Sequence, residues 1–190
     1  TITVSERYEL GLDDTRSLEL KGAPGEEQMA TITLHNGGNT YDTFVISISM
    51  ESGGGGGMDD NWGLIYDSSI DIPPLTSQNV SIVIIPPEGM RAGTHMGWVN
   101  ISSTGDPGQM AMVNIEFQVT SIYSIALDVR HNTNEVPNGS TLATGWVEGE
   151  RVNLDITAYN NGNDDDELYV YLEGEEGCEQ VWNAALTTDY

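Results

Sequence analysis

The stretch GEEQMATITLHNGGNTYDTFVISI, residues 25–48, decides the fold of this 190-residue chain, because a later stretch matches it without a gap. Residues 149–172 read GERVNLDITAYNNGNDDDELYVYL, at a constant offset of 124, and eight of the 24 aligned positions are identical. The identical pairs include Ile32/Ile156, Asn36/Asn160, Gly38/Gly162 and Asn39/Asn163. A repeat of this length indicates an array of whole small domains and not a solenoid of short units.

A shorter echo precedes the main repeat. Residues 8–13 (YELGLD) match residues 123–128 (YSIALD) at an offset of 115, so the spacer is nine residues longer in the second copy. The first copy, residues 1–120, has the usual length of one domain with its own core. The second, residues 121–190, stops little more than halfway. We therefore expect one complete domain and a second repeat that is either truncated or completed by another chain.

Apolar and polar residues alternate along most of the chain. Ile32 and Leu34 alternate with Thr31 and Thr33, and the aligned Ile156 keeps the same phase. A period of two is typical of a half-buried antiparallel strand. In the first copy the pattern predicts seven strands, at about 3–12, 28–36, 42–50, 62–72, 78–85, 94–103 and 110–119. We therefore expect an all-β chain of tandem seven-stranded immunoglobulin-like β-sandwiches, the second one incomplete in this chain.

The charge is strongly acidic, with 30 Asp and Glu against six Lys and Arg, a net charge of −24. Such a field repels phosphate, so we expect neither nucleic acid nor anionic lipid as a partner. It favours solubility, cation binding or a saline medium that screens the self-repulsion. The longest apolar run, Val80–Pro87, is far shorter than a membrane span, so none is expected within this sequence.

Three motifs carry a resemblance to a known family. They are PGE-x(5)-ITLxNxGNxxDxF from Pro24, IPPLTSQNVSIVIIPP from Ile72, and GxxxGWVNISS from Gly93. Together they resemble the CARDB and NEW3-type immunoglobulin-like domains of large archaeal and bacterial secreted or surface-layer-associated proteins. The resemblance implies a stalk, spacer or adhesive module at the cell surface. Its motifs specify core and turns, not chemistry.

Three asparagines fit the N-x-S/T pattern for attachment of a glycan: Asn79, Asn100 and Asn138. Asn79 and Asn100 each stand beside residues that the alternation places inward, so their side chains are expected to face solvent. Glycosylation there would agree with an extracellular location, whereas the alternative is chance occurrence in a chain rich in Ser and Asn.

The loop at residues 161–167 (NGNDDDE) offers Asn163, Asp165 and Glu167 at alternating positions. Oxygen ligands in a flexible loop suit Ca²⁺, so these three are the candidate calcium ligands. The order of an EF-hand is missing, and the aligned first-copy loop at residues 36–42 has a single acid. A solvated acidic turn is the alternative interpretation. No other cofactor is indicated.

The sequence shows no catalytic pattern. The three histidines, His35, His95 and His131, are scattered, and Cys178 has no partner cysteine, which disfavours a transition-metal site and an internal disulfide. The hydrolase, zinc-protease and phosphate-loop motifs are missing. We therefore expect no enzyme and no catalytic residues. Exposed tryptophans could stack on sugars, and the candidates are Trp62, Trp98, Trp146 and Trp182, of which Trp62 is expected to pack in the core.

These observations favour an extracellular structural protein of a prokaryotic surface layer, stalk or filament, archaeal or from a saline setting. Its partners would be adjacent repeats or like subunits, contacted through stacking and sheet edges. An incomplete second domain could accept a strand, for example residues 1–13, from the next subunit. The alternative function is a carbohydrate- or calcium-dependent adhesin or accessory module of a secreted protein, with surface glycans as partners.

Overall fold

The computed structural model describes residues 3–13, 16–51, 61–140 and 154–169. Contacts within the chain divide it into two units. The first unit comprises residues 1–125 together with 161–164, and the second comprises 126–160 and 165–190. Strands, turns and extended segments make up the described residues, and none of these residues is helical.

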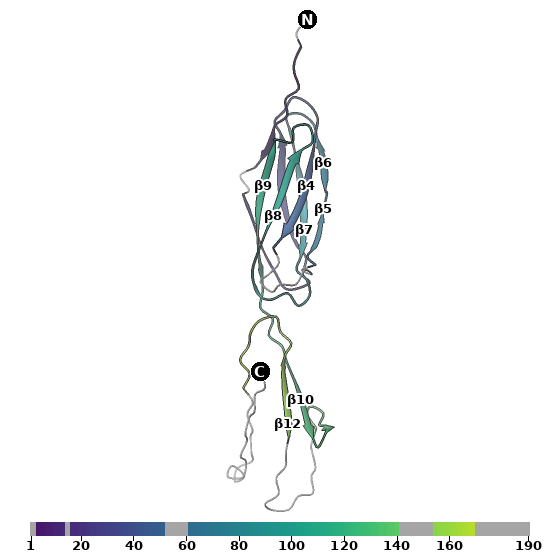
Figure 1. The fold of residues 1–190 in the computed structure, drawn as a ribbon, viewed down its shortest axis with the longest axis vertical. Coiled ribbons are helices and arrows are strands. Elements are labelled where there is room, and N and C mark those ends of the chain that lie inside the picture. The colour runs from purple at the N-terminus through teal and green to yellow at the C-terminus, as the bar shows by residue number, and fades with distance from the viewer. Residues whose placement is uncertain (1–2, 14–15, 52–60, 141–153, 170–190) are drawn as a thin grey trace, which may run out of the picture. The chain divides into compact units, whose positions relative to one another are not determined.

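Two sheets build the first unit (Figure 1). The four-stranded sheet has the order β1 (Leu10–Leu12), β3 (Gln28–Asn36), β7 (Thr76–Ile85) and β5 (Gly63–Tyr66). The five-stranded sheet has the order β2 (Ser17–Gly22), β9 (Met110–Val119), β8 (Gly93–Ser103), β4 (Asp42–Met50) and β6 (Ser69–Ile72). Neighbouring strands are antiparallel except for the pair β2 and β9, which is parallel.

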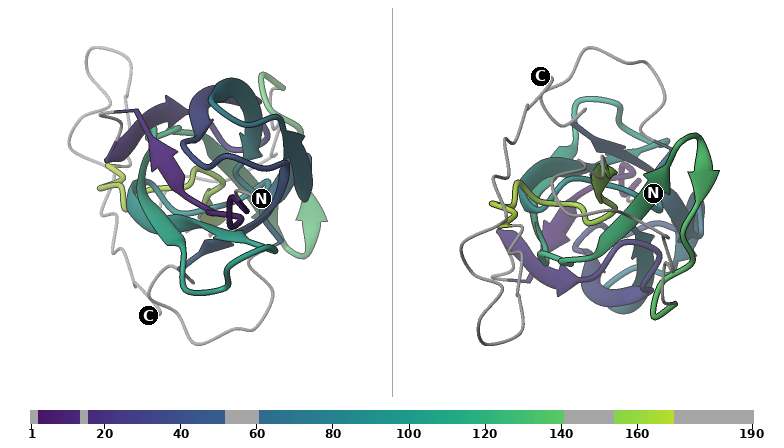
Figure 2. Two further views of the ribbon diagram at one scale, coloured as in Figure 1. Left: turned by 90° about the horizontal axis from the view of Figure 1, so that it is seen from above. Right: turned by 90° about the horizontal axis from the view of Figure 1, so that it is seen from below.

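The core of the first unit lies between the two sheets. The long strands turn every second side chain inward over most of their length, as the period of two predicts. The most deeply buried apolar residues are Ile32, Leu34, Val80, Ile82 and Ile84 from the four-stranded sheet, and Phe44, Ile46, Ile72, Val99, Ile101, Val113, Ile115, Phe117 and Val119 from the five-stranded sheet. Viewed from either end, the strands of this unit lie around a common centre (Figure 2). The predicted immunoglobulin-like β-sandwich is therefore confirmed for the first unit.

The single strand predicted at 62–72 is in fact two strands in different sheets. β5 pairs with β7, whereas β6 pairs with β4. The chain crosses between the sheets at Asp67 and Ser68, where the carbonyl oxygen of Ser68 accepts a hydrogen bond of 2.8 Å from the amide of Ile46. The sequence pattern shows the apolar alternation on both sides of the crossing but does not show the change of partner.

The first predicted strand, at 3–12, is also different in the structure. Only Leu10–Leu12 forms a strand, β1, and a strand that the pattern did not predict, β2, follows at Ser17–Gly22. β1 joins one sheet and β2 joins the other, parallel to β9 over six register pairs. The sequence SLELKG in β2 alternates over too few residues to predict a strand by itself.

In the second unit, the described strands form one sheet in the order β11 (Asn134–Glu135), β10 (Ile125–His131) and β12 (Asp155–Asn160). A two-residue turn joins β10 to β11, and its residues Asn132 and Thr133 have φ values of 48° and 69°. Positive φ at both positions matches the right-handed twist of a hairpin. β12 aligns with the second part of β3, and β10 lies beside β12 as β1 lies beside β3.

Candidate assembly site

The turn after β3 is built on Asn36, whose side chain is completely buried. Its Nδ2 donates hydrogen bonds of 2.9 Å to the carbonyl oxygens of Thr40 and Ile72. Its Oδ1 accepts one of 2.9 Å from the amide of Gly38. With both side-chain polar atoms bonded, the buried amide stabilises the turn instead of destabilising the core.

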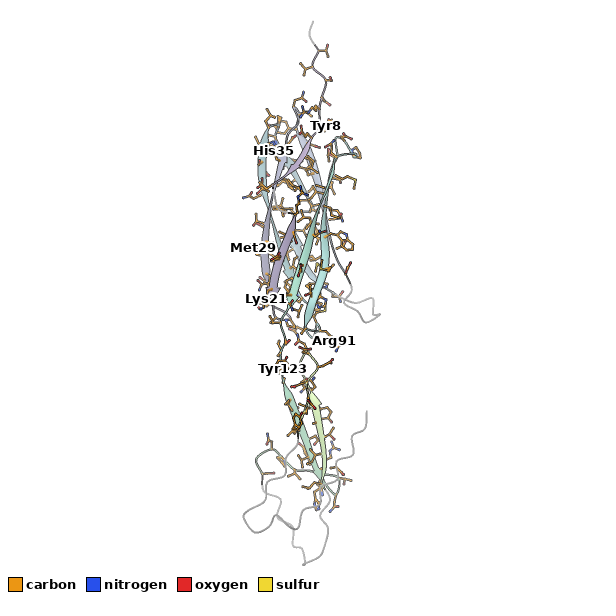
Figure 3. All side chains as sticks on the ribbon, turned by 90° about the vertical axis from the view of Figure 1, so that its left-hand side faces the viewer. Tyr8, Lys21, Met29, His35, Arg91 and Tyr123 are labelled. Carbon is orange, nitrogen blue, oxygen red and sulfur yellow. The ribbon has the colours of Figure 1, made fainter. Side chains whose placement is uncertain are left out.

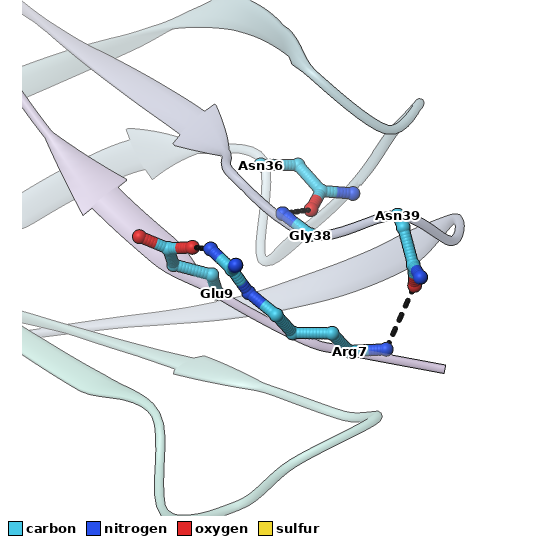
Figure 4. Close-up of polar contacts among 5 residues, drawn as sticks. All are labelled: Arg7, Glu9, Asn36, Gly38 and Asn39. Carbon is cyan, nitrogen blue, oxygen red and sulfur yellow. Dashed lines mark hydrogen bonds and ion pairs between the residues drawn. The ribbon is translucent and has the colours of Figure 1, made fainter. Parts of the chain in front are cut away.

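Asn39, at the end of this turn, binds the segment that precedes β1 (Figure 4). Its Oδ1 accepts a hydrogen bond of 2.7 Å from the amide of Arg7, and its Nδ2 donates one of 3.0 Å to the carbonyl oxygen of Ser5. Its main-chain amide donates to the carbonyl oxygen of Arg7 at 3.1 Å. A side chain at Gly38 would overlap that carbonyl oxygen. The Arg7 guanidinium pairs with the carboxylate of Glu9.

Asn163 repeats this set of hydrogen bonds in the turn that it forms within the first unit. Its Oδ1 accepts from the amide of Ile122 at 2.6 Å, and its Nδ2 donates to the carbonyl oxygen of Thr120 at 3.0 Å. Its main-chain amide donates to the carbonyl oxygen of Ile122 at 3.0 Å. The asparagine is displaced by 124 residues from Asn39, and its partners by 115 from Ser5 and Arg7. These are the two offsets of the sequence repeat.

A fourth hydrogen bond follows the same offsets. The amide of Gly37 donates to the carbonyl oxygen of Glu9 at 2.9 Å, and the amide of Asn161 donates to the carbonyl oxygen of Ser124 at 2.8 Å. The two turns therefore share these four hydrogen bonds. The sequence repeat identified these asparagines but gave no sign that they bind the segment ahead of the first strand.

Asn163 makes two hydrogen bonds beyond this shared set. Its Nδ2 also donates to the carbonyl oxygen of Met90 at 3.0 Å, and its carbonyl oxygen accepts from the amide of Ala92 at 2.9 Å. The residues Met90–Ala92 are the last three of the connection between β7 and β8, and they are called the 90–92 loop. Asn163 is 9% exposed in this position, whereas Asn39 is exposed.

A second buried polar cluster closes the turn between β8 and β9. The Ser103 hydroxyl donates to Oδ2 of Asp42 at 2.5 Å, and the amide of Gly105 donates to Oδ1 at 3.1 Å. The Ser103 oxygen in turn accepts from the amide of Asp106 at 2.9 Å. Asp42 and Ser103 are 4% and 3% exposed. Because the carboxylate is enclosed and both of its oxygens accept hydrogen bonds, the cluster stabilises the turn.

Tyr8 lies over this turn, and a side chain at Gly105 would overlap its ring. Its hydroxyl donates a hydrogen bond of 3.0 Å to the Glu6 carboxylate, and this bond raises the pKa of Tyr8 above its ordinary value. Desolvation and the negative charges of Glu6 and Asp42 raise the pKa further. Each of these causes favours the neutral phenol over the phenolate.

The sheet edges of the first unit are short. β1, β5 and β6 have three or four residues each, and β2 has six. Short edges limit uncontrolled pairing with other chains. β1 is already paired with β3, with Leu10 opposite Asn36 and Leu12 opposite Leu34. Donation of residues 1–13 to another subunit, the hypothesis drawn from the sequence, would require these bonds to break.

The three candidate glycosylation residues lie at different places. Asn79, on β7, is exposed, and its Oδ1 accepts a hydrogen bond of 3.0 Å from the Thr33 hydroxyl. Asn100, on β8, is half-buried, and Asn138 is exposed in the segment after β11. The neighbours Val80, Val99 and Ile101 are buried, as the alternation predicts. Glycosylation itself stays a prediction.

The structure describes the candidate calcium residues in two separate units. Asn163 belongs to the first unit, where its Oδ1 already accepts the hydrogen bond from Ile122. Asp165 and Glu167 belong to the second unit and are exposed. Among the described residues, no group of three His, Cys, Asp or Glu side chains lies close enough to hold a metal ion. Calcium binding stays a prediction.

Trp62 and His95 occupy packing positions in the first unit. Trp62 lies edge-on to Phe117 and to His95, with ring centres 5.3 Å and 5.7 Å apart. Nε2 of His95 is 3.0 Å from the carbonyl oxygen of Arg91. Trp98 is half-buried on β8. The remaining residues singled out in the sequence lie outside the described ranges: Trp146, Cys178 and Trp182.

The fold of the first unit defines an immunoglobulin-like β-sandwich, through its strand order and register. No family model matches the chain, and neither does any curated protein. No helix among the described residues is long and apolar enough to cross a membrane.

Several solved structures are similar to the chain. PapD-like domain 7 of human CEP192 is 14% identical, with a TM-score of 0.47, over 59% of this chain and 85% of that one. The class 5 fimbriae chaperone CfaA is 13% identical, with a TM-score of 0.43, over 82% of this chain and 68% of that one. The E. coli chaperone DraB is 13% identical, with a TM-score of 0.41, over 59% of this chain and 54% of that one. At these identities the similarity concerns the fold alone.

Proposed function

We propose that this protein is a non-catalytic structural module of a prokaryotic surface layer, stalk or filament, related to the CARDB and NEW3-type domains. It acts outside the cell by stacking repeats and by contacts along sheet edges. Its partners are adjacent repeats and like subunits.

The observation that carries the proposal is the bonding of residues 120–125, which connect the two sequence repeats. Asn161 and Asn163 bind this segment through Ser124, Ile122 and Thr120, with hydrogen bonds of 2.6 to 3.0 Å. The Ser121 hydroxyl also donates to the carboxylate of Asp164 at 2.7 Å. A flexible tether leaves its backbone solvated. A segment bonded at successive residues suits a protein whose task is to set a spacing.

The charge supports a saline or extracellular setting for the same role. Thirty acids against six bases make separate molecules repel one another at low ionic strength. At about 1 M salt the screening length falls to roughly 3 Å, so short-range contacts between molecules can then dominate. Assembly of this protein is therefore expected to increase with salt. Glycans on Asn79, Asn100 or Asn138 would agree with this location.

The test is the assembly state of the native protein across a salt series. Sedimentation and electron microscopy are expected to show ordered oligomers or filaments whose mass fraction rises with salt. Dispersed monomers at every salt concentration would reject the proposal. A glycan array and a calcium titration, run on the same preparation, distinguish the structural module from the alternative function, an adhesin or accessory module. Specific glycan binding, or a melting temperature that rises with calcium, would favour the adhesin or accessory module.

A further inference from the structure

Asn39 and Asn163 make the same local hydrogen bonds but differ in what covers them. The 90–92 loop covers Asn163, through the carbonyl oxygen of Met90 and the amide of Ala92. Within the described residues, the carbonyl oxygen of Asn39 and the second hydrogen of its Nδ2 have no such partners. The Asn39 turn therefore presents the same donor and acceptor that the 90–92 loop binds at Asn163.

The two complementary surfaces lie at opposite ends of the first unit. In Figure 3, Tyr8, which follows the segment Ser5–Arg7, and His35, which precedes the Asn39 turn, lie toward one end, and Arg91 of the 90–92 loop lies toward the other. Complementary surfaces at opposite ends suit a head-to-tail contact between repeats. In this chain Asn163 already occupies the 90–92 loop, so the loop that meets the Asn39 turn has to belong to a copy of the first repeat whose loop Asn163 does not occupy.

The 90–92 loop is held in shape by the first repeat itself. The Met90 side chain is 8% exposed and belongs to the core, and its amide donates to the carbonyl oxygen of Pro87 at 3.1 Å. The preceding Gly89 has a φ of 78°, which favours glycine. Because these contacts already order the 90–92 loop, little conformational entropy would be lost when the loop binds an Asn39 turn.

We propose that the Asn39 turn, with residues Ser5–Arg7, is a docking site for the 90–92 loop of another copy of the first repeat, one whose loop is not occupied by Asn163. The Nδ2 of Asn39 donates to the Met90 carbonyl oxygen of that copy, and the Asn39 carbonyl oxygen accepts from its Ala92 amide. This inference deepens the proposed function, because it names the partner surface through which repeats stack.

The test is a fusion that keeps the register of the repeat. Residues 1–120 are joined directly to Glu6 of the full chain, so that Thr120 of the added copy occupies the place of Ser5. A Met96→Leu substitution in the added copy marks its peptides by mass, and Met96 is 39% exposed. Amide hydrogen exchange at Ala92 of the added copy is then measured. We expect it to slow by about tenfold or more relative to a control with Gly-Ser-Gly inserted after Thr120.

A second variant separates docking from folding. The substitution Asn39→Asp is made in the part of the fusion that follows the added copy. It keeps the side-chain oxygen that accepts from the Arg7 amide and removes the Nδ2 donor. Ala92 of the added copy should then exchange as fast as in the spacer control, while Asn163→Asp should leave that amide unaffected. Equal exchange rates in the direct fusion and the spacer control would overturn the inference.

The outcomes distinguish this inference from the proposed function. Salt-dependent filaments of the native protein, together with an unprotected Ala92 in the fusion, would leave assembly standing and reject this docking surface. A protected Ala92, together with a native protein that stays monomeric, would support the docking surface and reject assembly as the function.

Discussion

Two strands with similar sequences have different surroundings in this molecule. Ile32 of β3 is 1% exposed and Leu34 is completely buried. The aligned residues of β12 are Ile156, which is half-buried, and Ala158, which is exposed. In the first unit the five-stranded sheet covers the apolar face of β3. The described strands of the second unit form a single sheet, and β12 has no second sheet over it among them.

The difference shows what an alternating pattern encodes. The alternating pattern determines which face of a strand is apolar, but the burial of that face depends on residues far away in the sequence. The repeated turn behaves differently, because its hydrogen bonds are local to the turn and the segment beside it. The four hydrogen bonds between the turn and that segment are therefore reproduced in the second repeat, whereas the burial of the strand is not.

The largest expected effect comes from truncating the aligned isoleucines. Ile32→Ala should lower the free energy of unfolding by about 2–5 kcal/mol, because it leaves a cavity in a closed core. Ile156→Ala should cost less than about 1 kcal/mol, since its side chain is half-buried. Guanidinium unfolding followed by circular dichroism measures both. Equal losses would show that the two strands are covered alike, which would remove the contrast.

The next effect comes from the aligned asparagines. Asn163→Ala removes three side-chain hydrogen bonds at a buried position, and the expected loss of stability is about 2–3 kcal/mol. Asn39→Ala removes two at an exposed position, and the expected loss is about 1 kcal/mol. Calorimetry on the two single variants measures the difference. A larger loss for Asn39 would contradict the role assigned to the 90–92 loop.

Gly38 tests the close approach of the turn to the N-terminal segment. Gly38→Ala should cost about 1–3 kcal/mol, because the new methyl group overlaps the Arg7 carbonyl oxygen, which belongs to the backbone. The matched control is Gly37→Ala, whose methyl group would meet the flexible side chain of Glu9 at 2.9 Å. Thermal unfolding should separate the two variants. A control that is as unstable as Gly38→Ala would argue against the backbone overlap.

The smallest effect is the pH dependence contributed by Tyr8. Its pKa is raised above the ordinary value of 10.0, so the stability from the neutral phenol is complete below that pH. It is lost as the pH rises through the folded-state pKa. Glu6→Gln should lower the pKa of Tyr8, because the hydrogen bond to a carboxylate is the largest cause of the shift. An NMR titration of the Tyr8 ring measures this, and an unchanged pKa would contradict it.

Much of the first unit could be predicted from its sequence. The strands at 28–36, 42–50 and 110–119 have the predicted bounds, because each has one apolar face over nine or ten residues. The short strands are where the prediction fails. The pattern predicts one strand where β5 and β6 are two, and it predicts no strand at β2, because the sheet that a four- to six-residue strand joins depends on its neighbours in space.

The candidate site was only half predictable. The repeat identified Asn39 and Asn163 as equivalent, and the second offset matched residues 8–13 with 123–128, which directly follow the bonded segments at 5–7 and 120–122. The contact between each asparagine and its segment was not predictable, because an alignment offset says nothing about which residues touch. The contact with the 90–92 loop had no signal in the sequence, because it depends on main-chain atoms that any residue carries.

The parallel pairing of β2 with β9 has a mechanical consequence. β2 lies near the start of the first repeat and β9 at its end, and six register pairs join them. Tension applied in opposite directions along these two strands would load the hydrogen bonds of all six pairs in shear, instead of opening them one after another. Stretching of single molecules should therefore show this unit yielding in one abrupt event.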